Sequence, residues 1–216
     1  MLTNEYVGIN ESFDSFSDQT YYFQILQSSP EFPSEKIGSN QGQRFTIIYL
    51  IGILLNSFNL KDYWYSIFII LNLTIITYSI YIFIKLIGNF EKKLNQNFKF
   101  ILCLIILFNP YFFRVSIYAP LMINDYIFVL GILLLIYSIF FNNNFLTYFS
   151  IILCSLSRQT SMILVPILFF LYIYEGIIYK KFNQIKYLIC ILLITLIFFI
   201  TYKISSSFSL DSNYSN

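Results

Sequence analysis

The sequence predicts an all-α, polytopic helical membrane protein. Of its 216 residues, 57% are hydrophobic and only 11% are charged, whereas soluble domains have about 25% charged residues. Apolar runs of membrane-crossing length recur between Phe45 and Lys203. These observations exclude a water-soluble enzyme. They also predict short juxtamembrane helices and a polar N-terminal loop at the outer membrane face.

The first element is a polar segment, residues 1–43, which contains six of the eleven acidic residues and a single lysine. Such a segment cannot lie in lipid, because charged side chains are costly there. Within it, Ser17-Asp18 followed by Gln-Thr-Tyr-Tyr predicts a short helix, which Ser28-Ser29-Pro30 would end. The segment is therefore predicted to be an aqueous loop that contains one helix.

A transmembrane domain is predicted over residues 44–204, followed by a polar tail, 205–216. Its first apolar run, 45–58, rises only about 21 Å as a helix, against about 30 Å for a hydrocarbon core. Two interpretations stay open for this run, a juxtamembrane helix and a short span, and its length favours the former. Pro166 is expected to kink a later span. The predicted spans are 63–87, 98–109, 126–141, 145–156, 160–178 and 187–203.

Flanking cations predict the orientation of the spans. Counting crossings from residue 63 puts seven lysines on one side: Lys85, Lys92, Lys93, Lys99, Lys180, Lys181 and Lys186. The opposite side receives Lys61, Arg114, Arg158 and Lys203. We expect the seven-lysine side to be cytoplasmic. If 45–58 does not cross, the acidic N-terminal segment shares the outer face with the 110–125 loop and the turn at Arg158.

Residue types narrow the chemistry. The net charge is only +2 and the cations form no basic face, so nucleic acid is not an expected partner. The chain contains no histidine, so carboxylates must do any acid or base chemistry. The three cysteines lie singly in apolar runs and are predicted to be buried packing residues.

Two carboxylates at the predicted outer face are candidates. Asp18 either takes a proton from an acceptor hydroxyl or binds a divalent ion, or it caps the helix that follows, and these roles are compatible. Asp125 precedes the 126–141 run, so a helix cap is its simplest interpretation. Alternatively, Asp125 orients the acceptor or shares a metal ion with Asp18.

Two arginines are candidates for binding an anion. Arg114 and Arg158 are placed on the outer face against the positive-inside tendency. A guanidinium fork suits phosphate oxygens, so both are predicted to bind a lipid phosphate or diphosphate. The alternative is that they snorkel to headgroups or pair with Asp125. Arg44 and Lys36 are weaker candidates of the same kind.

Four short motifs follow one another over residues 14–178: Ser17-Asp18-Gln-Thr-Tyr-Tyr, Gln41-Gly-Gln-Arg44-Phe, Asn109-Pro-Tyr-Phe-Phe-Arg114 through Asn124-Asp125, and Leu156-Ser-Arg158-Gln-Thr-Ser with Pro166. In this order the chain resembles integral-membrane glycosyltransferases of the C-type superfamily (GT-C), such as protein mannosyltransferases and lipid A aminoarabinose transferases. The motifs resemble the family's first-loop Asp with its short helix, the segment that leads into the juxtamembrane helix, the second outer loop, and a hairpin whose second helix carries a proline.

The resemblance implies sugar transfer from a polyprenyl-phosphate or polyprenyl-diphosphate donor to a glycan, lipid or protein acceptor, at the outer face of the cytoplasmic (inner) membrane. It implies that Asp18 is the base and that Asp125 assists it. Arg114, Arg158 and Arg44 would neutralise the leaving phosphate. Because some members use a divalent metal and others do not, the need for a metal stays open. The family's first span, before the Asp loop, is absent here, so we expect a fragment of a longer protein or an inactive relative.

Other functions stay open beside this one. A membrane glycan polymerase or ligase predicts a much larger outer loop between later spans, which this chain does not contain. A transport subunit predicts ionisable groups at mid-bilayer, and the runs 63–87, 126–141 and 187–202 carry none away from their ends. A non-catalytic assembly subunit would tolerate the loss of Asp18 and both arginines.

Overall fold

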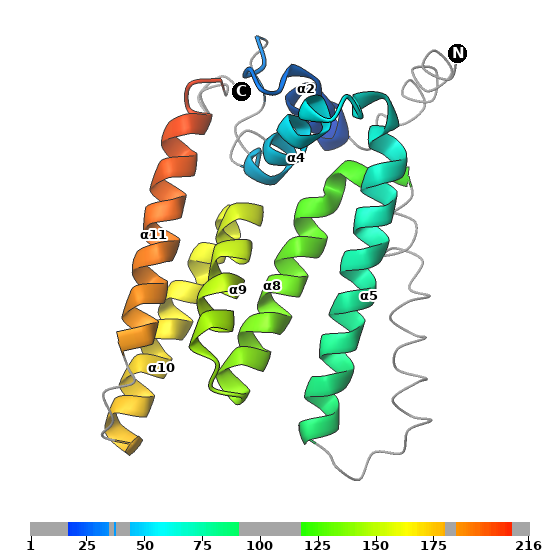
Figure 1. Ribbon diagram of the computed structural model, residues 1–216. Coiled ribbons are helices and arrows are strands. Elements are labelled where there is room, and N and C mark those ends of the chain that lie inside the picture. The colour runs from blue at the N-terminus through cyan, green and yellow to red at the C-terminus, as the bar shows by residue number, and fades with distance from the viewer. Residues whose placement is uncertain (1–16, 35–36, 38–43, 91–117, 180–184, 209–216) are drawn as a thin grey trace.

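The computed structural model describes residues 17–34, 37, 44–90, 118–179 and 185–208. The regular structure of these ranges is helical, which confirms the predicted all-α class (Figure 1). The α-helices are α2 (Ser17–Ser28), α4 (Thr46–Ser57), α5 (Trp64–Phe90), α8 (Ile123–Phe140), α9 (Asn144–Ser157), α10 (Leu164–Tyr179) and α11 (Ile185–Ser205). Three 3-10 turns precede α5, α8 and α10: η2 (Lys61–Tyr63), η3 (Pro120–Met122) and η4 (Gln159–Ile163).

In the described part of the chain, four helical segments are long and apolar enough to cross a membrane: Lys61–Gly88, Pro120–Phe140, Gln159–Ile177 and Ile185–Ser205. In the last two, only 17% of the most apolar window is buried inside the protein. Most of their side chains therefore point outward, as expected of helices whose solvent is lipid. The described part of the chain has the lengths and composition of a multi-pass membrane protein.

The other predicted spans differ from these four. The run 145–156 corresponds to α9, whose 14 residues rise about 21 Å and fall short of a hydrocarbon core of about 30 Å. The run 98–109 lies outside the described residues. Pro166 lies in the first turn of α10, where N–H groups have no acceptor within the helix. Its position therefore suits the start of α10, and the kink of the span stays a prediction.

The helices form a bundle with two distinct ends (Figure 1). At one end, called the α2/α4 end, α2 and α4 lie beside the starts of α5 and α8 and the last turn of α11. At the opposite end, called the hairpin end, lie the α8–α9 turn and the last turns of α5 and α10. Lys61 and Lys203 belong to the first end, and Lys85 and Lys186 to the second. This distribution matches the predicted one for the described lysines.

The α2/α4 end is held by the largest apolar cluster, to which α2, α4, α5 and the start of α8 all contribute. Gly52 of α4 lets α2 approach closely, because a Cβ atom there would lie 3.0 Å from the carbonyl oxygen of Leu26 and 2.2 Å from Oγ of Ser29. The ammonium of Lys61 donates to the carbonyls of Gln27 and Ser29, at 2.9 and 2.6 Å. It thereby satisfies carbonyls at the C-terminal end of α2. The position of α2 at this end is thus fixed from two sides.

Helices α8 and α9 form a tight antiparallel hairpin. Asn142 adopts φ 52° in the turn, a left-handed conformation that asparagine tolerates better than most residues. A Cβ atom at Gly131 would lie 2.6 Å from Sγ of Cys154, so the two helices touch at this glycine. Because the helices are antiparallel, the first turn of α8 lies beside the last turn of α9. That arrangement brings Asp125 to Arg158.

Candidate functional site

Asp125 and Arg158 form an ion pair between α8 and the end of α9. Nε and Nη2 of Arg158 lie 2.7 and 2.6 Å from Oδ1 of Asp125. The side chains are 28% and 36% exposed, for Arg158 and Asp125 respectively. Within the described residues neither side chain has another hydrogen bond or ion pair. Of the alternatives left open for Arg158, pairing with Asp125 is the one that the structure contains.

The expectation that Asp125 caps a helix is wrong. The N-cap of α8 is Met122, without a side-chain hydrogen bond, and Asp125 lies inside the first turn. The reason is that Pro120–Met122 form a 3-10 turn that leads into α8, so the helix starts earlier than the apolar run. A carboxylate in the first turn of α8 and a guanidinium just after α9 both lie where helix dipoles favour their charges.

Arg44 is joined to this region through Asn124. The amide of Asn124, which is 1% exposed, donates from Nδ2 to the carbonyl oxygen of Arg44 at 2.8 Å. This bond fixes the start of α4 against the first turn of α8. Because Asn124 precedes Asp125 in the chain, the backbone of Arg44 is held beside the residue next to the paired carboxylate.

Four buried polar atoms on the starts of α4 and α8 and on the end of α9 have no hydrogen-bond partner in the described part of the chain: Nε of Arg44, Oγ1 of Thr46, Oδ1 of Asn124 and Oγ of Ser155. Thr46 is the first residue of α4, and Ser155 lies on α9 three residues before Arg158. Buried polar atoms nearly always have partners. The α2/α4 end is therefore where a polar ligand would find unused donors and acceptors.

The remaining predicted site residues are only partly placed. The backbone of Asp18 lies in the first turn of α2, at the same end of the bundle as Asp125 and Arg158. The side chain of Asp18 and the whole of Arg114 lie outside the described residues. The structure therefore brings together Asp125 and Arg158, holds the backbone of Arg44 against the neighbouring Asn124, and leaves the roles of Asp18 and Arg114 as predictions.

A divalent metal does not fit the described donors. Over residues 17–34, 37, 44–90, 118–179 and 185–208, no group of three acidic or cysteine side chains comes together. At the α2/α4 end, the carboxylate of Asp125 is bound to a guanidinium, whereas divalent ions need several oxygen ligands. No step of the chemistry below is therefore assigned to a metal.

Sequence reasoning missed a second polar cluster, at the hairpin end. The hydroxyl of Tyr187 donates to Oε1 of Glu175. Nζ of Lys186 lies 4.0 Å from Oε2 of Glu175 and donates to Oδ1 of Asn142 at 3.3 Å. The same nitrogen lies 4.8 Å from the ring centroid of Tyr187, within cation–π range. This cluster ties the α8–α9 turn, α10 and α11 together.

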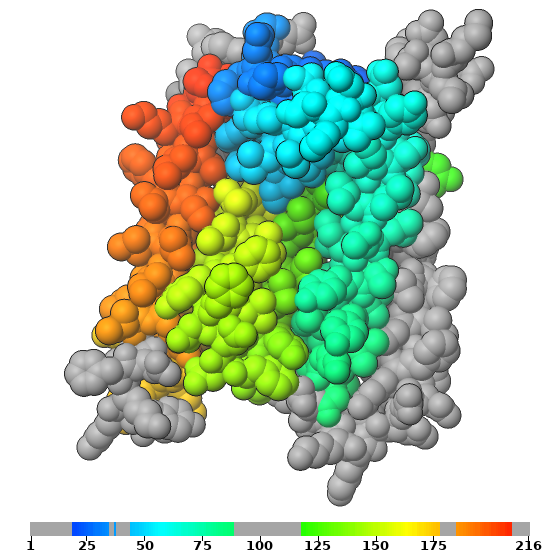
Figure 2. All heavy atoms as spheres, in the orientation of Figure 1, coloured from blue at the N-terminus to red at the C-terminus, as the bar shows by residue number. Residues whose placement is uncertain are grey.

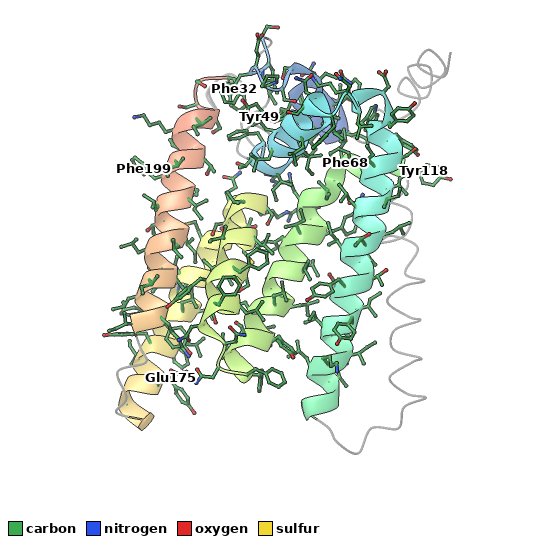
Figure 3. All side chains as sticks on the ribbon, in the orientation of Figure 1. Phe32, Tyr49, Phe68, Tyr118, Glu175 and Phe199 are labelled. Carbon is green, nitrogen blue, oxygen red and sulfur yellow. The ribbon has the colours of Figure 1, made fainter. Side chains whose placement is uncertain are left out.

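The location of this second cluster indicates a structural role. Figure 3 shows Glu175 near the hairpin end, far from Tyr49 and Phe68 at the α2/α4 end. Lys186 is only 7% exposed and Tyr187 is fully buried. The signal available in the sequence was Glu175, an acid within the apolar run 160–178, since ionisable groups in spans rarely lack a partner.

Comparisons of the chain with models of protein families, with curated proteins and with solved structures found no match. The fold is all-helical, and in the described residues it contains four segments that could span a membrane.

Proposed function

We propose that this protein is a membrane glycosyltransferase of the GT-C kind, which transfers a sugar from a polyprenyl-phosphate-linked donor to an acceptor at the membrane face where α2 and α4 lie. The observation that carries the proposal is the Asp125–Arg158 contact at 2.6 Å, formed at the end of the bundle where the Asp18 backbone and Arg44 also lie. All four motifs of the resemblance thus have a residue at one end of the molecule.

The proposed reaction is a single displacement. Asp18 takes the proton of the acceptor hydroxyl, and the acceptor oxygen forms a bond to the anomeric carbon of the sugar. The bond from that carbon to the donor phosphate breaks, and its electron pair leaves with the polyprenyl phosphate. Arg158, Arg44 and Arg114 stabilise the charge on the leaving phosphate, which counts most in a partly dehydrated site.

Asp125 has a positioning role in this scheme. It holds Arg158 through one oxygen, which receives both Nε and Nη2. The guanidinium is therefore oriented before the donor binds, and Nη1 is left to donate to a phosphate oxygen. Because the pair is about one-third exposed, an incoming phosphate group can compete with the carboxylate for the guanidinium.

The test is a transfer assay on the full chain in membranes, with polyprenyl-phosphate sugars as donors. Replacing Asp18→Asn keeps the side-chain size but removes the base, so we expect the rate to fall by about 10²–10⁴-fold. Asp62→Asn, an exposed acid in η2 at the same end, serves as the matched control and should keep the rate. Equal rates for the Asp18 variant and the unaltered protein would remove Asp18 as the base. No transfer by the unaltered protein would remove the function.

One observation favours a second candidate function, a non-catalytic assembly subunit. The charges of Asp125 and Arg158 compensate each other directly, as they would in a tie between two helices. In a pair that is about one-third exposed, such a tie contributes only about 0–1 kcal/mol. A subunit of this kind would transfer no sugar, which the same transfer assay would reveal. It would also stay bound to its partner proteins after the loss of Asp125 or Arg158, and affinity purification would reveal this.

A further inference from the structure

Asn72 is a fully buried asparagine inside Lys61–Gly88, one of the segments that could span a membrane. It lies about 12 Å along the helix axis from Trp64, where α5 begins. A carboxamide at this depth is costly unless it forms hydrogen bonds within the protein. Nδ2 of Asn72 donates to the carbonyl oxygen of Pro120 at 2.9 Å. The residue therefore joins α5 to the turn that precedes α8.

The hydrogen bond from Asn72 reaches the 3-10 turn η3, which determines where α8 begins. Pro120 is the first residue of η3, and it is buried together with Leu121. Because η3 leads directly into Ile123, Asp125 lies inside the first turn of α8. A hydrogen bond to Pro120 thus holds the turn on which the position of Asp125 depends.

A second buried asparagine holds the same segment against another helix. Asn124 lies about one helical turn after Pro120, and its Nδ2 donates to the carbonyl oxygen of Arg44 at 2.8 Å. Arg44 leads into α4, which lies beside the first turns of α5 at this end of the molecule (Figure 2). Two side-chain amides therefore fix the start of α8 at two points, one on the α5 side and one on the α4 side.

Two fixed points determine how the first turn of α8 is rotated about the helix axis. Successive residues of an α-helix point about 100° apart, so the direction of the Asn124 side chain sets that of Asp125. Nη2 of Arg158 lies 2.6 Å from Oδ1 of Asp125, and a contact of this kind depends strongly on geometry. A rotation of this turn would move the carboxylate away from the guanidinium.

We propose that Asn72 is a positioning residue, which orients the first turn of α8 so that Asp125 meets Arg158. It acts through the carbonyl of Pro120, while Asn124 supports the same turn from the α4 side. Asn72 itself does not touch the substrate. The effect on the ion pair is a property of the fold, whereas the consequence for sugar transfer rests on the proposed function.

Solid-state NMR of the full chain in lipid bilayers tests the two contacts without an assay of activity. With ¹⁵N-labelled asparagine and proline labelled with ¹³C at the carbonyl, a dipolar coupling reports the Asn72–Pro120 bond, because no proline in the chain is followed by an asparagine. With ¹⁵N-labelled arginine and aspartate labelled with ¹³C at Cγ, a coupling reports the Asp125–Arg158 pair, and Arg158→Lys assigns it. We expect both couplings in the unaltered protein. Absence of the asparagine–proline coupling would overturn the proposal.

Variants of Asn72 test whether the first contact controls the second. Asn72→Leu keeps the side-chain volume but removes the donor, so we expect the Asp125–Arg158 coupling to be lost. Ser79→Ala is the matched control, because Ser79 is also buried in α5 but its hydroxyl donates within the helix, to the carbonyl of Ile75 at 2.8 Å. Asn72→Ala is the second variant should the leucine variant not fold. An unchanged Asp125–Arg158 coupling in a folded Asn72 variant would overturn the proposal.

Transfer assays then separate the positioning role from the proposed function. We expect Asn72→Leu to lower the transfer rate by up to about 10²-fold, as small misplacements of reacting groups do. It should have little further effect once Asp125→Asn has removed the partner of Arg158. Equal losses in the two backgrounds would show that Asn72 does not act through Asp125 and would overturn the proposal. If the unaltered protein transferred no sugar while the couplings behaved as expected, only the proposed function would be contradicted.

Discussion

Replacing Arg158 by alanine is expected to lower the rate of sugar transfer by about 10²–10³-fold, the usual effect of losing one donor to a developing negative charge. The stability should hardly change, because the Asp125–Arg158 pair is about one-third exposed and such pairs contribute about 0–1 kcal/mol. A large loss of rate at nearly constant stability is what separates a ligand to the donor phosphate from a tie between helices. The measurements are the transfer rate and the melting temperature of the same purified variant.

Two further variants sharpen this prediction. Lys203→Ala removes an exposed cation from the last turn of α11, at the same end of the bundle, and should leave the rate unchanged. Arg158→Lys keeps the charge but loses the planar fork, so we expect a rate between those of the alanine variant and the unaltered protein. Transfer at the unaltered rate by Arg158→Ala would contradict the phosphate-binding role. A loss of rate that only follows a loss of folded protein would also contradict it.

Replacing Lys186 by methionine is expected to cost about 3 kcal/mol of stability, at the lower end of the effect of removing one partner from a buried charge pair. The ammonium is 7% exposed, but it lies 4.0 Å from Oε2 of Glu175, whose side chain is 26% exposed, which reduces the penalty. The variant leaves that carboxylate without its cation and Asn142 without the Lys186 donor. Unfolding by sodium dodecyl sulfate in mixed micelles measures the change.

The double variant Lys186→Met with Glu175→Gln is the informative partner of this experiment. It leaves no unpaired buried charge, so much of the lost stability should return. Lys85→Met, which changes an exposed lysine near the same end of the bundle, should shift stability by less than about 0.5 kcal/mol. If the double variant were as unstable as the sum of the two single changes, the cluster would not act as one unit.

Hydropathy alone predicted the fold class, because helices that face lipid carry their apolar residues all around rather than on one stripe. It predicted α5 and α11 closely for this reason. It also predicted a span at 145–156, whereas α9, with 14 residues, is shorter than the four candidate spans and packs on α8 and α11. Apolar content does not distinguish burial in protein from burial in lipid. The length of an apolar run is what separates segments that can span the bilayer from segments that cannot.

The candidate site was predictable as residue types, and the pairing of Arg158 with Asp125 only as one of the open alternatives. Arg158 and Asp125 stood out because charges are rare in this chain, yet their pairing depends on the hairpin register that Gly131 and Cys154 set. The role of Asn124 in holding Arg44 spans 80 positions of sequence, and no local pattern encodes it. The start of α8 was misplaced because a 3-10 turn at Pro120 has no hydropathy signal of its own.

The central claim is that the proposed base and the phosphate-binding guanidinium face the same side of the membrane, and the sidedness of single cysteines tests it most directly. Cys103, Cys154 and Cys190 are replaced by alanine, and Asp18→Cys, Arg158→Cys or Asn144→Cys is then introduced. Sealed vesicles of each orientation are treated with a membrane-impermeant thiosulfonate. Positions 18 and 158 are predicted to react from one side and position 144, at the hairpin end, from the other. Reaction of positions 18 and 158 from opposite sides would contradict the claim.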